Sequence, residues 1–232
     1  MDELNAPSLG DWGGLSESKF NSGTDFLDQD YEGRTTDQLS LRERIDIVEQ
    51  AEKHVRKLVE DGVVRYDNGF PLNVYAAIEE LGLSVEEGPL HQSNVRIGGR
   101  EIAGAIIKKP GEDYPHILLE KSGEPQHKLF TASHELGHYL EWCERVPADQ
   151  RKKVYWGDIR PEHAADKHGG DRTPSEYAAN TFAQLLLMPT DLVIAELQNG
   201  RNVDQIAQRF GVTHDSAVRR LSYFDIATQT YE

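Results

Sequence analysis

The sequence reads Thr131-Ala132-Ser133-His134-Glu135-Leu136-Gly137-His138-Tyr139-Leu140 near its middle and so contains the pattern His-Glu-x-x-His. Residues four apart lie on one face of a helix, and therefore His134 and His138 can direct both imidazole rings at one ion. Glu135 is turned only about 100° from His134, so its carboxylate can reach a water beside that ion. This spacing predicts a metal-dependent peptidase with one Zn²⁺ per chain (Mn²⁺ is the alternative ion) and Glu135 as the general base.

A catalytic zinc usually has three protein ligands and one open position, so a third ligand must come from elsewhere in the chain. Glu176 is the main candidate because it opens a second apolar helix that could lie across the first. The stretch Thr173-Pro174-Ser175-Glu176 also fits a capping box, in which Glu176 would bond back to the Thr173 N–H. A loop could instead deliver His163 or His168. The residues alone leave these alternatives open.

The two histidines must be neutral and correctly oriented, which requires hydrogen-bond partners on their second ring nitrogens. Asn180 in the second helix and Glu141, on the same helix face as the histidines, are the candidates for that role. The oxyanion formed during peptide hydrolysis also needs a donor. Tyr155, His163 and His168 in the polar segment after the motif are available, and nothing in the sequence selects one of them.

Apolar spacing and turn residues predict an α+β fold. Helices are expected at 41–60, 70–81, 125–145, 175–188, 191–198 and 203–224. Strands are expected at 83–86, 102–108 and 116–120, in a small antiparallel or mixed sheet. Residues 102–108 are our candidate for an exposed sheet edge, to which an extended substrate could add as a further strand.

The first forty residues differ from the rest of the chain because they hold nine acidic and two basic residues. We interpret residues 1–39 as an acidic tail that is disordered or folds only on a partner, and residues 40–232 as the peptidase domain. Within it, 40–190 would form the core that carries the motif and 191–232 the C-terminal helices. The formal net charge of −15 opposes tight binding to nucleic acid.

No apolar run approaches the length of a membrane span, so no transmembrane helix is predicted. The N-terminal residues are acidic and lack the basic start and apolar core of a signal peptide. Cys143 is the only cysteine, which excludes an intrachain disulfide, and we expect it to be a core residue. These features favour a cytoplasmic protein.

Residues 205–221 offer a rival interpretation, because their Ala, Gly and Leu positions resemble a helix-turn-helix with Gly211 in the turn. The chain would then be a DNA-binding or protein-binding regulator whose metal site is structural or inactive. Alternatively, these helices pack against the rest of the domain. The acidity of the chain and the few basic residues in this segment favour packing.

The sequence resembles the ImmA/IrrE family of zinc metallopeptidases of bacteria and their mobile elements over residues 45–221. The resemblance rests on residues 130–140, on Glu176-Tyr177-Ala178-Ala179-Asn180-Thr181-Phe182-Ala183 and on Leu185-Leu186-Leu187-Met188-Pro189. It implies a minimal zincin-like fold with His134, His138 and Glu176 as ligands and Glu135 as the base. It also implies helix-turn-helix repressors or antitoxins as substrates.

Two features depart from the family pattern. Trp142 stands where the family often has a histidine four residues after the second ligand. The spacing between His138 and Glu176 is long because of an insertion at residues 145–170. We interpret this insertion as a lid or a specificity element.

Overall fold

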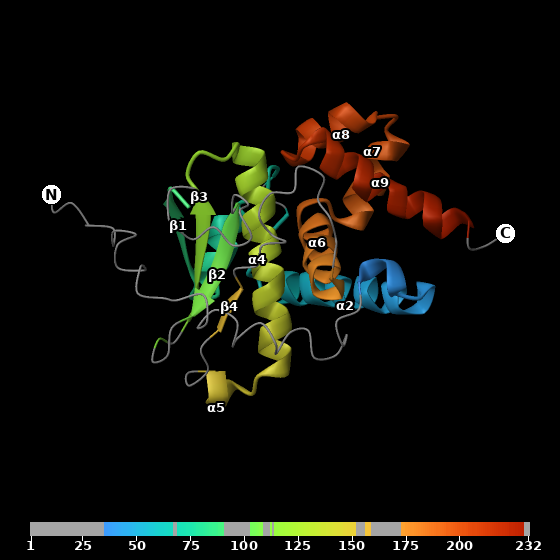
Figure 1. The fold of residues 1–232 in the computed structure, drawn as a ribbon. Helices are drawn as coiled ribbons and strands as arrows, with labels where there is room; N and C mark the ends of the chain where they lie inside the picture. The colour runs from blue at the N-terminus through green and yellow to red at the C-terminus, as the bar shows by residue number, and fades with distance from the viewer. Residues whose placement is uncertain are drawn as a thin grey trace, which may run out of the picture.

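Helix α4 (Pro125–Arg145), which carries the motif, lies between a small sheet and the other long helices (Figure 1). The computed structural model describes residues 35–66, 69–90, 103–108, 112, 114–151, 156–158 and 173–229. The remaining elements are η3 (Thr36–Gln38), α2 (Leu41–Glu60), α3 (Val74–Glu80), β1 (Ser84–Gly88), β2 (Gly104–Lys108), β3 (His116–Glu120), α5 (Ala148–Arg151), β4 (Trp156–Asp158), α6 (Pro174–Leu187), α7 (Thr190–Gln198), α8 (Val203–Phe210) and α9 (His214–Gln229). This arrangement confirms the predicted α+β class.

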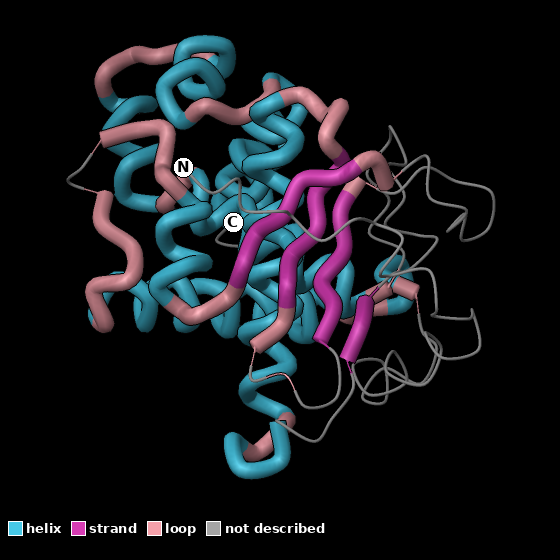
Figure 2. Tube along the Cα trace, turned by 90° about the vertical axis from the view of Figure 1, so that its left-hand side faces the viewer, coloured by secondary structure: helices cyan, strands magenta, loops and turns pink. Residues whose placement is uncertain are grey.

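The sheet is mixed. Within the described residues its strands pair in the order β1-β3-β2-β4. β1 runs parallel to β3, whereas β2 is antiparallel to both β3 and β4. Figure 2 shows the strands side by side, with helices packed against one face. Among the described strands, β2 and its neighbour β3 make the most extensive contacts with α4.

The prediction that residues 102–108 form an exposed edge is wrong. β2 is an inner strand because β4 pairs with it, so that Ile106 lies opposite Asp158 and Lys108 opposite Trp156. β4 comes from the polar segment after α4, and its three residues are too few to show the alternation by which a strand is recognised in a sequence. The edges of the described sheet are β1 and β4.

Two glycines let α4 pack closely on both sides. A Cβ atom on Gly104 of β2 would clash with the Thr131 side chain of α4. A Cβ atom on Gly137 of α4 would lie 3.0 Å from Phe182 Cδ1 and 3.2 Å from Ala179 Cα, both on α6. The lack of a side chain at Gly137 therefore lets the backbone of α6 approach the histidine motif.

Replacing Gly137 by Ala should destabilise the fold and loosen the contact between α4 and α6. The added methyl group must displace Phe182 or Ala179, and overpacking of this kind costs about 1–3 kcal/mol. Ala in a helix would otherwise be favoured over Gly by roughly 1 kcal/mol, so a lower unfolding temperature isolates the steric effect. Thermal unfolding of the metal-free protein measures it, and a variant more stable than the parent would contradict this close packing.

Helix α2 begins where the sequence predicts, with Ser40 as its N-cap. Just before it, Leu39 is buried against Ile47 of α2 and Tyr177 of α6. The chain therefore already makes core contacts inside the segment interpreted as a tail. Residues 1–34 lie outside the described residues, and the proposed boundaries of the tail and of the two-part domain stay predictions.

Helix α3 is shorter than predicted. It begins at Val74, with Asn73 as its N-cap, and not at Phe70. The Phe70 ring instead lies edge-on against Phe210 of α8, with 4.7 Å between the ring centroids. The connection between α2 and α3 therefore packs against the C-terminal helices and is not part of a longer helix.

The C-terminal helices form a helix-turn-helix-like arrangement, in which Gly211 (φ +68°) ends α8 and α9 follows. Arg220 of α9 is buried. It donates through Nε to Met188 O at 3.0 Å and through Nη2 to Thr190 Oγ1 at 2.8 Å, at the junction of α6 and α7. α9 is therefore attached to the helix that carries Glu176.

Helices α6 and α7 follow one another with a sharp bend. In the described part of the chain, no single helix is both long and apolar enough to cross a membrane, whereas α6 and α7 taken together, bent by 54° at their junction, reach the required length and composition. Most side chains of α6 are buried in the core.

Candidate metal centre

Three side chains that the sequence singles out meet between α4 and α6. His134 and His138 lie one turn apart on α4, and their Nε2 atoms are 3.0 Å apart. Glu176, in the first turn of α6, places Oε1 3.2 Å from His138 Nε2 and Oε2 3.4 Å from His134 Nε2. All three residues are buried. The structure therefore brings two nitrogen donors and one carboxylate to a single point.

The donor atoms lie about as far apart as the ligands of one metal ion do. Zinc bonded at about 2.0–2.1 Å in tetrahedral geometry holds its ligand atoms about 3.3 Å apart. Here the two Nε2 atoms are 3.0 Å apart, and each of them lies close to a different oxygen of the Glu176 carboxylate, at 3.2 Å for His138 and 3.4 Å for His134, which are separations close to that value. Two imidazoles and one carboxylate are also a usual ligand set for a catalytic zinc, with a fourth position left open. The residues present therefore fit a metal ion.

The start of α6 explains how Glu176 reaches the histidines. Thr173 is the N-cap, and its Oγ1 accepts from the Glu176 N–H at 3.3 Å. The Glu176 carboxylate is directed at His134 and His138. The sequence left open whether the Glu176 carboxylate caps α6 or binds metal, and the cap observed here uses the Thr173 hydroxyl and the Glu176 N–H instead. Thr173 caps the backbone of α6, and the Glu176 side chain enters the cluster.

Asn180, one turn after Glu176, determines which ring nitrogen of His134 is protonated. Asn180 Oδ1 lies 2.9 Å from His134 Nδ1. A carboxamide oxygen can only accept, so Nδ1 carries the proton and donates it. In a neutral imidazole, Nε2 is then unprotonated and directs its lone pair at the cluster. A metal ligand that binds through Nε2 must have this tautomer.

Comparison with known families agrees with this geometry. The IrrE N-terminal-like domain family of M78 peptidases matches residues 78–222, which include α4 and α6 and extend into α9. The chain belongs to the ImmA/IrrE metallopeptidase family. A search of curated proteins finds no match. Helices α7 and α8 of this metallopeptidase lie inside the matched segment.

Of the other candidate site residues of the metallopeptidase, the structure describes some and not others. Glu135 is buried on α4, between the two histidines in sequence. Tyr155, His163 and His168 lie outside the described residues, so the choice of an oxyanion donor among them stays a prediction. Much of the 145–170 insertion is outside the described residues as well, and the idea of a lid is not tested.

Glu141, the other predicted partner for the histidine rings, lies between two groups that the sequence did not point to. Its carboxylate accepts from Arg145 Nη2 at 2.6 Å and from Ser175 Oγ at 3.2 Å. Burial raises the pKa of Glu141, and Arg145, His138 and Ser175 offset only part of that effect. The carboxylate therefore bridges α4 and the first turn of α6.

Two neighbours of the motif are packing residues. Trp142, which stands where the family often has a histidine, is buried in the core. Cys143 is half-buried against that core, and burial raises the pKa of its thiol. A raised thiol pKa opposes nucleophilic chemistry, in agreement with the expectation that Cys143 is a core residue.

Replacing Asn180 by Ala should weaken zinc binding by about 10–100-fold, the usual cost of losing a residue that orients a metal-bound histidine. The change removes the acceptor for His134 Nδ1. Ala also favours a helix more than Asn does, so unfolding of α6 would not explain the loss. Asn180→Asp keeps an acceptor and serves as the control. Competition with a chelator measures the zinc affinity of both variants. An Asn180→Ala variant with parental affinity would contradict this role.

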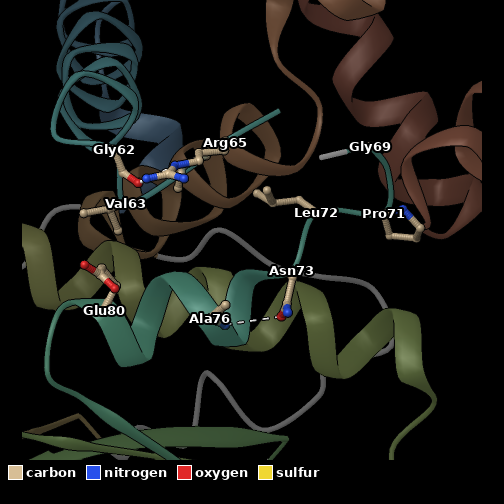
Figure 3. A pocket seen from close by; sticks show the side chains of 10 residues that line it. Gly62, Val63, Arg65, Gly69, Pro71, Leu72, Asn73, Ala76 and Glu80 are labelled. Carbon is tan, nitrogen blue, oxygen red and sulfur yellow. Dashed lines mark hydrogen bonds between the residues drawn. The ribbon is translucent and has the colours of Figure 1, made fainter. Parts of the chain in front are cut away.

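A hollow lies away from the metal centre, and Figure 3 shows the side chains that line it. Its volume is about 430 Å³, and its walls come from the α2–α3 connection and from α3, with Val63, Leu72, Ala76 and Glu80 among them. No residue of α4 or α6 lines it. It is therefore separate from the cluster of histidines and Glu176.

Proposed function

We propose that this metallopeptidase is a zinc-dependent endopeptidase that cleaves a regulatory protein at a defined site. The observation that carries the proposal is the buried cluster of His134, His138 and Glu176 within the segment that matches the family. Imidazole nitrogens are usual ligands of zinc, and the Glu176 carboxylate supplies the third protein ligand. We infer one zinc ion per chain, with Mn²⁺ as the alternative ion.

In this proposal each residue of the cluster has one task. His134 and His138 bind the ion through Nε2, and Glu176 binds it through its carboxylate. Zinc held there supplies a Lewis acid for the scissile carbonyl and lowers the pKa of water. Asn180 keeps His134 in the tautomer that binds metal. Glu135 accepts the proton of the attacking water on its carboxylate and passes it to the leaving amine.

The proposed substrate is a helix-turn-helix repressor or an antitoxin. Membership of the family supports a protein substrate. The formal net charge of −15 and the pI near 5.0 favour encounter with a basic partner, and proteins that bind DNA present basic surfaces to its phosphates. A substrate of this kind would place the reaction in the cytoplasm.

The test incubates the zinc-loaded protein with DNA-binding regulators encoded beside its gene, and with an unrelated protein of similar size. We expect one regulator to be cut at a single site and the Glu135→Gln variant to leave it intact. Cleavage of the unrelated protein at a similar rate would overturn the proposed specificity. Cleavage of the regulator by Glu135→Gln at the parental rate would overturn the mechanism.

Direct DNA binding, the rival function, has less support. A helix that reads base edges needs an exposed basic face. On α9, Arg220 is buried and bonded to the junction of α6 and α7, which leaves Arg219 as the exposed arginine of the helix, and Asp215 adds a negative charge in the first turn. A gel-shift assay at low salt tests whether the protein binds DNA directly. No shift with promoter DNA removes the rival function, and a salt-dependent shift restores it.

A further inference from the structure

Glu141 joins the two helices that carry the metal-binding residues. It lies one turn after His138 on α4, and its Oε2 accepts from Ser175 Oγ of α6 at 3.2 Å. Its Oε1 accepts from Arg145 Nη2 at 2.6 Å. The Glu141 side chain is 17% exposed, and Ser175 is fully buried. The contact between the two helices is therefore largely shielded from water. A hydrogen bond is stronger in such surroundings than it is in water.

Ser175 precedes Glu176 in the first turn of α6. A carboxylate at this end of a helix is also favoured by the helix dipole. We propose that Glu141 is a positioning residue, which holds the first turn of α6 against α4 and so sets the distance between Glu176 and His138. This inference rests on the proposed metal site. It gives Glu141 a role that acts through Ser175 and not through a histidine ring.

Shielding the Glu141 carboxylate from water costs free energy, which favours a role in positioning the helices over a role in stability. Burial raises the pKa of Glu141, and the positive charge of Arg145 offsets only part of that effect. A buried ion pair is often no more stabilising than apolar residues of the same volume. The contact of Glu141 with Arg145 and Ser175 therefore serves to fix the separation between α4 and α6. A metal site needs a fixed separation because its metal–ligand distances vary little.

Glu144 provides a matched control on the same helix. Its carboxylate also joins α4 to another helix, since it accepts from Gln50 Nε2 at 2.6 Å and lies 3.0 Å from His54 Nε2. Both partners belong to α2. Replacing Glu144 therefore alters a contact between α4 and α2 and leaves the hydrogen bond between Ser175 and Glu141 unchanged.

The test measures zinc affinity, by competition with a chromophoric chelator, in the parent and in variants of both partners. We expect Glu141→Ala and Ser175→Ala each to weaken zinc binding about tenfold, the lower bound for residues that orient a ligand. The double variant should lose no more than the more affected single variant, because both changes remove one contact. Glu141→Gln keeps an acceptor for Ser175 and should recover most of the affinity, and Glu144→Gln should match the parent.

Other results would overturn the inference. Additive losses in the double variant would show that Glu141 and Ser175 act separately, and parental affinity in both single variants would show that neither matters. Ser175→Ala removes one hydroxyl group and keeps the test decisive if Glu141→Ala does not fold. A parent protein that binds no zinc would instead overturn the proposed function, and this inference with it.

Discussion

Replacing Glu135 by Gln should lower peptide cleavage by about 10²- to 10⁴-fold, the usual contribution of a general base, while zinc binding stays at the parental level. Gln has nearly the same size and shape as Glu, so it can occupy the same buried position on α4. Its amide cannot accept a proton from water. The measurement is a single-turnover cleavage rate beside the zinc content of the same sample.

Glu144→Gln is the matched control for this prediction, because it makes the same chemical change on the same helix. Glu144 bonds to α2 and lies outside the cluster of histidines, so the control variant should cleave at close to the parental rate. A zinc-loaded Glu135→Gln variant that retains parental turnover would exclude Glu135 as the base. A variant that loses zinc would show that the carboxylate supports the metal site and not the proton transfer.

The half of the metal centre on α4 could be predicted because its geometry is local. His134 and His138 are one helical turn apart, and Pro125 marks the first position of the helix. Glu176 could not be chosen from residues alone, because a residue three positions after Thr173 suits a cap and a ligand equally. The choice depends on how α6 lies across α4, which the close packing at Gly137 permits.

Contacts between short, distant segments could not be predicted at all. β4 has three residues, too few for a periodic pattern, and its pairing with β2 turns an expected edge into an inner strand. Ser175 resembles any residue in the first turn of a helix, and nothing in the sequence indicates that its hydroxyl meets Glu141. Phe70 precedes a proline and suits the start of a helix, yet it packs against Phe210.

Replacing Glu176 by Ala should weaken zinc binding by more than about a hundredfold, because losing a ligand costs more than losing a residue that orients one. The remaining donors, His134 and His138, would leave zinc with two protein ligands, fewer than the three of catalytic sites. The measurement is zinc content after dialysis, together with competition against a chelator. Cleavage should fall in proportion to the zinc that is lost.

Thr173→Ala separates the cap from the ligand. Thr173 Oγ1 accepts from the Glu176 N–H, a contact that Glu176→Ala leaves in place. The loss of this cap should therefore cost about 1 kcal/mol of stability and little zinc, whereas Glu176→Ala should cost zinc and little stability in the metal-free protein. If Glu176→Ala retained its zinc after dialysis and was instead destabilised like Thr173→Ala, the Glu176 carboxylate would be part of the helix cap, and the third ligand would have to come from another residue.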